Sequence, residues 1–408
     1  MSEILFLAHR IPFPPDRGDK IRSHHILKAL AKLAPVHVGC FMDDDADAAE
    51  EAELASVAAS HCLVRRTRLV PVAALQALAS GKPVSLPAFA SSAMARYVAK
   101  VIAERPVSTL FVFSVQMAQY IPAGFAGRVV MDFVDVDSAK FESYAAQAGQ
   151  PLRSIYAREG RLLRRFEERI ARRADASLLV TPEEAALFAR RVDRSDPPRI
   201  EALGNGIDAA FYDPAGMPIA PELVSGGPQI VFTGQMDYPP NIAAVQLFAR
   251  QVMPAIRQKF SHARFHIVGR QPAPAVMALN GINGTAVQGR VPDVRPWLAG
   301  ADLVVAPLTI ARGVQNKVLE AMAMGRAVLC TTAAATGIGA KRGAEFAVAD
   351  GADALAHEAT ILLGDQARRD EMGAAGRRFV LASCSWDSVL TRLPGLAGFP
   401  RRERRDAA

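Results

Sequence analysis

The chain lacks any stretch that would cross a membrane as a helix. No uncharged apolar run reaches the roughly 18 residues that such a helix needs. The first apolar run, residues 4–8, is short and charge follows it at once, so we expect no signal peptide. These features predict a cytoplasmic protein that at most lies peripherally on the inner face of the plasma membrane.

Cysteine is scarce as well, with only Cys40, Cys62, Cys330 and Cys384 in 408 residues and no C-x-x-C pair. Reduced thiols are therefore expected rather than a disulfide framework. Charged residues make up an ordinary 22%, and the net charge of +7 favours anionic partners such as nucleotides, nucleic acid or lipid head groups. No basic-aromatic run or helix-turn-helix signature is evident, so nucleic acid is not an expected partner.

What the sequence does contain is a regular alternation of short apolar runs and helix-length amphipathic segments. This rhythm is typical of doubly wound α/β sheets with parallel strands covered on both faces. Predicted helices include residues 21–33, 94–104, 156–173 and 243–259. The predicted strands are residues 4–8, 36–41, 110–113, 129–133, 177–180, 230–232, 265–268, 303–306, 328–331 and 345–348.

The rhythm breaks once, over residues 212–228, which are rich in Pro and Gly and have no period. We read this segment as a linker between two Rossmann-like domains, residues 1–210 and 228–378. Residues 379–393 look helical, and residues 379–408 would form a helix crossing back to the first domain and a basic tail. No repeat of 20–50 residues is evident.

Ligands of doubly wound folds bind beyond the carboxyl ends of the strands, where helix N-termini direct amides at anions. The loop after the first strand contains Arg17, Gly18, Asp19 and Lys20 but no G-x-G-x-x-G fingerprint. Gly18 would let the backbone approach a ligand, and Asp19 is a good helix N-cap. The loop is either an ordinary capped turn or one side of an acceptor site.

Two carboxylates, Asp135 and Asp137, form a D-x-D after the fifth strand of the first domain. Such a pair can hold a divalent metal, or it can cap the helix that follows. We expect no metal, and a polar role at the site for Asp135 rather than Asp137.

In the second domain, weaker signals are Gly234 and Arg270, each after a predicted strand, and Arg290 in the loop of residues 288–293. Gly234 could admit a phosphate or sugar to the backbone, and Arg270 supplies a cation at a strand end. Asn241 is a predicted cap for the helix after Gly234.

The strongest signal lies in residues 312–325, where a turn containing Gly313 leads into a helix that Gly325 ends. Lys317 lies near the helix start, where a dipole worth ~0.3–1 kcal/mol adds to a charge-assisted hydrogen bond worth ~1.5–3 kcal/mol. Glu320 follows on the same face and could accept hydrogen bonds from two vicinal hydroxyls, such as those of a ribose. The alternative is a plain Glu–Lys helix pair.

Residues 318–325 resemble the L-E-A-M-A-x-G signature of family-4 glycosyltransferases with the GT-B fold. The resemblance extends over most of the chain, with N-G-I-D at residues 205–208, Pro-Glu at 182–183 and Trp386 near the end. It implies two Rossmann-like domains that face a central cleft. It also implies a retaining, metal-independent transfer from a nucleotide diphosphate-sugar, with no further cofactor.

The resemblance implies a role for particular residues. The donor-binding set would be Gly234, Arg270, Arg290, Gly313, Gln315, Asn316, Lys317 and Glu320. The catalytic set would be Asp135, Lys317 and Arg270, and the acceptor side would be formed by Arg17, Gly18, Asp19 and Lys20.

More narrowly, residues 15–22, 132–138 and 313–317 resemble sugar transferases of exopolysaccharide loci associated with the PEP-CTERM/exosortase system. This implies a lipid-linked or growing exopolysaccharide as acceptor. Two features depart from the family: Arg312 replaces the first glutamate of E-x7-E, and acid around Asp135 replaces a histidine. A sugar-nucleotide epimerase or a non-catalytic nucleotide-sugar-binding scaffold are the alternatives.

Residues 153–173 carry eight arginines, and residues 401–405 form a basic tail. Both could contact anionic lipid. The alternative for the first segment is a solvated helix face on which Glu159, Glu167 and Glu168 pair with some of the arginines.

Overall fold

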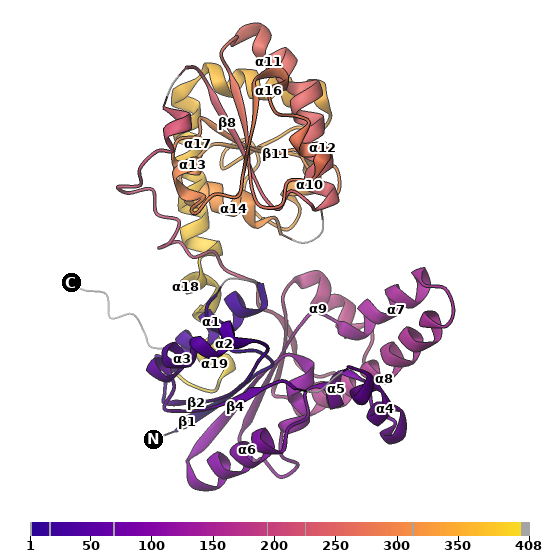
Figure 1. Cartoon of the computed structure of the whole chain (residues 1–408). Helices are drawn as coiled ribbons and strands as arrows, with labels where there is room; N and C mark the ends of the chain where they lie inside the picture. Colours follow the sequence, from indigo (N-terminus) through magenta and orange to yellow (C-terminus); the bar gives the residue numbers. More distant parts are fainter. Residues whose placement is uncertain are drawn as a thin grey trace, which may run out of the picture. The chain divides into compact units, whose positions relative to one another are not determined.

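The computed structural model of the chain (Figure 1) describes residues 2–15, 18–67, 70–193, 195–224, 226–311 and 314–400. The chain forms two compact units. The first comprises Met1–Asn205 together with Val389–Ala408, and the second comprises Gly206–Ser388. In the described ranges, no helix is both long enough and apolar enough to span a bilayer.

Over the described residues, the first unit contains a seven-stranded sheet of order β3-β2-β1-β4-β5-β6-β7 in which every pairing is parallel. Its central strands are buried because helices cover them. The strands are β1 (Glu3–Ala8), β2 (Val36–Met42), β3 (Ser60–Arg65), β4 (Val107–Phe113), β5 (Arg128–Val134), β6 (Ala176–Leu179) and β7 (Ile200–Ala202).

The helices of the first unit alternate with these strands, and the longest is α8 (Leu152–Arg173), which packs Leu163, Phe166 and Ile170 into the core. The end of the chain returns to this unit, where the Thr109 hydroxyl donates a hydrogen bond of 2.9 Å to the Ala397 carbonyl. The other helices are α1 (Gly18–Ala31), α2 (Asp45–Ala49), α3 (Glu51–Val57), α4 (Val70–Ser80), α5 (Ser85–Ala88), α6 (Ser92–Glu104), η1 (Val115–Tyr120), α7 (Asp137–Gln147), α9 (Pro182–Ala189), η6 (Leu390–Arg392) and α19 (Leu393–Leu396).

The second unit is built around a parallel sheet whose described strands number six, in the order β10-β9-β8-β11-β12-β13. The strands are β8 (Gln229–Thr233), β9 (Arg264–Val268), β10 (Thr285–Gly289), β11 (Leu303–Ala306), β12 (Val328–Cys330) and β13 (Ala347–Val348). The helices are η2 (Pro221–Leu223), α10 (Pro239–Leu247), η3 (Phe248–Val252), α11 (Met253–Lys259), α12 (Pro274–Met277), η4 (Ile282–Gly284), α13 (Arg295–Ala299), α14 (Asn316–Ala323), α15 (Thr332–Ala335), α16 (Ala352–Gly364), α17 (Gln366–Phe379) and η5 (Val380–Cys384).

The predicted doubly wound α/β fold is confirmed, and each predicted strand overlaps an observed one. Three strands were not predicted: β3, β7 and β10. All three are edge strands, and all are only partly buried. An edge strand needs no continuous apolar run, and that run was the signal used to predict strands.

Two predicted helices are interrupted. Residues 243–259 contain the π-helical segment η3 between α10 and α11, just before Pro254, whose missing N–H weakens the regular ladder. Residues 379–393 pass through η5 and then an extended Ser385 before α18 (Trp386–Val389). The prediction of one helix there was wrong, because Ser385 pairs with Ile207 in a parallel bridge.

The segment that reads as a linker packs against the second unit. Tyr212 and Met217 contact its core, Leu223 is buried in it, and the Ala220 amide donates to the Pro296 carbonyl. A Cβ on Gly206 would lie 2.6 Å from the Trp386 backbone, so glycine is needed where the second unit begins.

Candidate functional site

The candidate site of the second unit lies at the carboxyl ends of β8 and β9, where two glycines allow the chain segments to come close together. Gly234 follows β8 with a φ of +157°, and its amide donates to the Val268 carbonyl. A Cβ on Gly269 would lie 1.6 Å from the Gly234 carbonyl oxygen. Only glycine allows these two backbone segments to come so close. Without a side chain at Gly234, its backbone stays accessible next to the start of α14.

Lys317, the second residue of α14, directs its amine to this point. Its Nζ donates a hydrogen bond of 2.7 Å to the Asn241 Oδ1 and lies 4.2 Å from the centre of the Phe232 ring. A Cβ on Gly234 would be 2.9 Å from the same Nζ, so the glycine makes room for the amine. Burial lowers the pKa of Lys317 to about 8, against the opposing charge of Glu320.

Asn241 fixes the direction of that amine. Its Nδ2 donates 2.8 Å to the Gln235 carbonyl, which leaves Oδ1 to accept from Lys317. The expectation that Asn241 caps its helix was wrong, because α10 begins at Pro239 and Asn241 lies inside the first turn. A proline at the first position supplies the helix start without a side-chain cap.

Glu320 lies one helical turn after Lys317 and is partly exposed. Burial raises the pKa of Glu320, and the nearby Tyr212 phenol offsets part of that rise. Burial and the Glu320 charge likewise raise the pKa of the Tyr212 phenol. The pair therefore forms a polar position, one helical turn from the amine, that offers oxygen acceptors to a hydroxylated ligand.

Sequence reasoning missed Tyr212, because it falls in the segment assigned to the linker. Arg377 positions it, donating a hydrogen bond of 3.2 Å to the Tyr212 carbonyl and pairing with Asp213 at 2.9 Å. Nothing in the local sequence indicates this contact, which joins residues about 165 positions apart.

The other predicted donor residues that the structure describes follow the ends of β9 and β10 or open α14. Arg270 is exposed and donates 3.4 Å to the Gln235 Oε1, and Arg290 is exposed after Gly289. The Gly269 amide donates to the Gly289 carbonyl, so both arginines follow adjacent strand ends. Gln315 and Asn316 open α14, with Asn316 exposed. Arg312 and Gly313 lie outside the described residues.

In the first unit, the structure changes the reading of the loop after β1. Lys20 was predicted to face a ligand, and this was wrong. Its side chain is 2% exposed, its Nζ lies 2.5 Å from the Asp47 carboxylate, and it also donates to the Phe13 carbonyl. A buried ammonium needs such partners, and these leave it unavailable to an acceptor.

Asp19 does not cap α1, because the helix already begins at Gly18. Its carboxylate contacts His9 Nε2 at 3.3 Å and Arg10 Nη1 at 2.8 Å, and these groups hold its pKa well below the usual range. Gly18 is exposed, and Arg17 lies outside the described residues. Lys20 therefore leaves the predicted acceptor side, whereas Gly18 and Asp19 stay predictions.

Two histidines lie in this region. The His9 ring stacks on Phe113 with centroids 5.8 Å apart, at the carboxyl ends of β1 and β4. His24 is buried, with its Nδ1 3.2 Å from the Pro12 carbonyl oxygen. His9 therefore joins Asp19 at this edge of the sheet.

Asp135 and Asp137 follow β5, and the Lys140 amine bridges them at 3.4 Å and 3.0 Å. Neither caps α7, whose N-cap position is Val136. In the part of the chain that the structure describes, no three His, Cys, Asp or Glu side chains gather as a metal site requires.

The sequence also gave no sign of a buried pair, Arg22 and Asp132, joined at 2.9 Å. Arg22 Nη1 further donates to the Gly204 carbonyl and to Asn205 Oδ1, each at 3.0 Å. The pair therefore fixes the last residues of the first unit before the chain enters the second.

Residues 227–365 match the family model described as glycosyl transferases group 1. This stretch includes Gly234, Asn241, Arg270, Lys317 and Glu320. No curated protein matches the chain.

Solved structures share the fold across both units at low sequence identity. Sucrose-phosphate synthase from Thermosynechococcus elongatus is 16% identical with a TM-score of 0.62, covering 97% of this chain and 98% of its own. HepE from Anabaena, solved with UDP and glucose, is 15% identical with a TM-score of 0.60, covering 97% and 99%. A glycosyltransferase from Rickettsia africae is 13% identical with a TM-score of 0.63, covering 97% of each chain.

The family match covers the unit that holds Lys317 and Glu320, and the neighbours share the two-sheet architecture. The second unit thus contains a group 1 glycosyl transferase domain, and the chain is a glycosyltransferase with the GT-B fold.

Proposed function

We propose that this glycosyltransferase moves a sugar, with retention of configuration, from a nucleoside diphosphate-sugar to a glycan or lipid-linked acceptor. One observation carries the proposal. The Lys317 amine lies beside the accessible backbone of Gly234, and Glu320 follows one helical turn later, within the matched domain. A cation and a carboxylate at this spacing suit the diphosphate and the ribose of one nucleotide.

The chemistry that the site must supply is positive charge where the leaving diphosphate gains negative charge. Lys317 is partly buried and held by Asn241, so its ammonium acts in a medium of lower polarity than water. Arg270 and Arg290 are exposed cations near the same strand ends and would contact the outer phosphate. With this charge supplied by side chains, we propose that no metal ion or other cofactor takes part.

Glu320 and Tyr212 would hold the ribose. The carboxylate would accept hydrogen bonds from vicinal hydroxyls, and the nearby Tyr212 phenol would orient it. The acceptor hydroxyl would enter on the face that the diphosphate leaves. The acceptor side would include Gly18 and Asp19, with Asp135 as a polar group.

The narrower assignments rest on the sequence resemblance. They are membership of family 4, a role in exopolysaccharide synthesis of the PEP-CTERM type, and contact with an anionic membrane. Binding of UDP or UDP-glucose by HepE is a property of that protein, and it makes uridine nucleotides the first donors to test here.

A binding screen of UDP, GDP and ADP and their sugars against the pure protein tests the proposal. At least one should bind, and Lys317→Ala should weaken binding by ten-fold or more, as loss of a charge-assisted hydrogen bond worth ~1.5–3 kcal/mol predicts. Lys259→Ala is a matched control, because Lys259 is an exposed lysine of the same unit that also lies over an aromatic ring.

Turnover assays separate the possible activities. Release of nucleoside diphosphate that depends on a lipid-linked or glycan acceptor supports transfer. A free epimer formed without acceptor identifies an epimerase, and donor binding without turnover identifies a binding protein. Unchanged donor affinity in Lys317→Ala would exclude the proposed donor site.

A further inference from the structure

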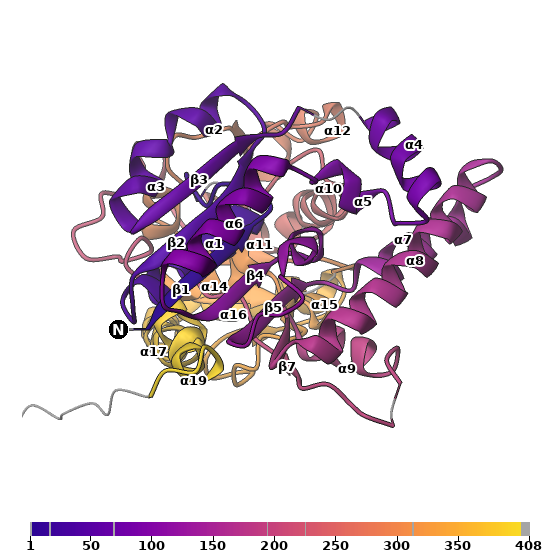
Figure 2. The ribbon, with the colours of Figure 1, turned by 90° about the horizontal axis from the view of Figure 1, so that it is seen from below.

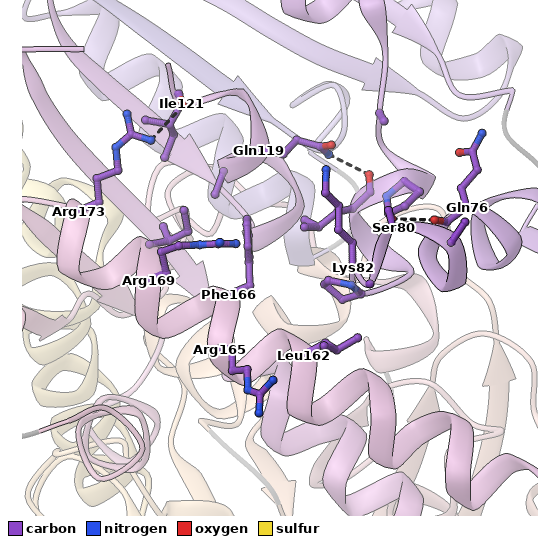
Figure 3. Close-up of a pocket in the computed structure, with 18 residues that line it drawn as sticks. Gln76, Ser80, Lys82, Gln119, Ile121, Leu162, Arg165, Phe166, Arg169 and Arg173 are labelled. Carbon is purple, nitrogen blue, oxygen red and sulfur yellow. Dashed lines mark hydrogen bonds between the residues drawn. The ribbon is translucent and has the colours of Figure 1, made fainter. Parts of the chain in front are cut away.

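A hollow in the first unit is lined by none of the residues assigned to donor or acceptor. It has a volume of about 1040 Å³ and is enclosed by α4, α5, η1 and α8 (Figure 3). Its floor is apolar, formed by Leu86, Pro87, Ala118, Ile121 and Phe166. The hollow is therefore a shaped surface with room for a sizeable group.

The rim of the hollow is cationic. Lys82, Arg165, Arg169 and Arg173 line it, and no acid stands among its lining residues in the described part of the chain. Figure 3 shows Arg169 lying along the Phe166 ring, with its guanidinium carbon 5.1 Å from the ring centre. Lys82 stands on the opposite side. Cations gathered without acids favour an anionic ligand.

The acids of α8 do not neutralise these arginines. Glu159 accepts hydrogen bonds from the amides of residues 84 and 85. Glu167 accepts hydrogen bonds from the amide and the hydroxyl of Ser138, at the start of α7. Glu168 pairs with the arginine four residues on. Among the described residues, Arg165 and Arg169 have no hydrogen-bond or ion-pair partner. The alternative that glutamates of α8 pair with its arginines is therefore excluded for Arg165 and Arg169.

Helix α4, which contributes to the lining of the hollow, buries small side chains and exposes large apolar ones, the reverse of a usual amphipathic helix. Its Ala73 and Ala77 are buried, whereas Leu75 and Leu78 are 70% and 64% exposed. The helix is held in place, because an α8 arginine, Arg158, donates 3.0 Å to the Ala77 carbonyl. Figure 2 shows α4 close to the α7–α8 hairpin. Gln76, Ala79 and Ser80 of α4 line the hollow, and Leu75 and Leu78 extend from the exposed side of the same helix.

We propose that this surface docks on a membrane containing anionic phospholipid. A head-group phosphate binds in the hollow between Lys82 and the two unpaired arginines, and the two leucines of α4 enter the lipid boundary. A soluble anion would use the cations but would leave the leucines exposed to water. An anionic bilayer satisfies both, and this combination is typical of interfacial helices. The proposal does not depend on the donor chemistry.

Vesicle flotation of the full chain tests it. The protein should float with phosphatidylcholine vesicles that contain about 30% phosphatidylglycerol, and not with phosphatidylcholine alone. Arg165→Gln/Arg169→Gln should lower the partition coefficient about 30-fold, since each cation near the surface contributes ~1 kcal/mol. Leu75→Ser/Leu78→Ser should also lower the partition coefficient on the same vesicles, and this loss should persist at high salt concentration.

The matched control is Arg96→Gln/Arg190→Gln, which removes the same charge from two exposed arginines of the first unit outside the hollow. It should keep the wild-type partition coefficient within about two-fold, because separated surface charges are screened beyond ~10 Å. Thermal melts confirm that each variant is folded. An equal loss in both arginine pairs, no vesicle binding by the wild type, or tight pyrophosphate binding without vesicle binding would each overturn the proposal.

Discussion

Raising the pH from 7 to 9 should weaken donor binding, because Lys317 loses its charge within this range. Burial lowers the pKa of this lysine to about 8, whereas an exposed lysine stays charged far above pH 9. Below pH 8 the amine is an ammonium that attracts the diphosphate. Above pH 8 it becomes a neutral amine and the attraction is lost.

The size of the effect follows from the titration. With a pKa of about 8, the charged fraction falls from about nine-tenths at pH 7 to about one-tenth at pH 9. If only the charged form binds, the apparent Kd rises about ten-fold, which corresponds to about 1.4 kcal/mol. Bound diphosphate itself raises the pKa of Lys317, so the complex should take up protons as it forms at pH 8 and above.

Calorimetric titration with a nucleotide-sugar at pH 7, 8 and 9 and constant ionic strength measures this. A nucleotide-sugar is preferable to a terminal phosphate, whose second ionisation near pH 6 would add its own slope. Lys317→Arg, which stays charged, should bind with no slope, and Lys317→Met should bind weakly at every pH. Lys259→Ala should keep the wild-type slope. A wild-type Kd that is flat from pH 7 to 9, or a slope that survives in Lys317→Met, would refute the reasoning.

Three further predictions concern folding and shape. Gly269→Ala should lower the free energy of unfolding by ~1–3 kcal/mol in urea titrations and weaken donor binding, while Gly18→Ala, with open space around it, should not destabilise. Burial raises the pKa of Glu167 to about 7, so the folded state holds its proton more tightly and wild-type stability should fall as pH rises from about 4.5 to 7. Glu167→Gln should abolish that dependence in thermal melts. Arg22→Met should cost ~3–5 kcal/mol by stranding the buried Asp132 carboxylate, and Arg22→Met/Asp132→Leu should recover much of it.

The fold could be predicted because its central strands are continuous apolar runs between amphipathic segments. That pattern follows directly from burial on both faces, and it fails at edges such as β3 and β10, where one side of the strand meets solvent. Helix breaks within 243–259 and 379–393 depend on a local π turn and on a bridge to a distant residue. Neither leaves a periodic signal.

The candidate site was predictable where it lies within one short segment. Lys317 and Glu320 belong to one helix, and their spacing alone places them on one face. Lys20 was misassigned because its partner Asp47 lies 27 residues on, and only the folded chain shows that the charge is buried. Tyr212 was missed because it falls in the segment that reads as a linker, and its contact with Arg377 joins residues far apart in the sequence.

The hydrogen bond between Thr109 and Ala397 has a practical consequence for work with fragments. The first unit is assembled from both extremities of the polypeptide, so no single cleavage liberates the two units intact. A fragment that ends at residue 205 would lack the segment that bonds Thr109. A fragment that ends at residue 388 would likewise remove residues 389–408, which belong to the first unit. Dissection therefore calls for excision of residues 206–388 with a bridging loop, or for a circularly permuted gene.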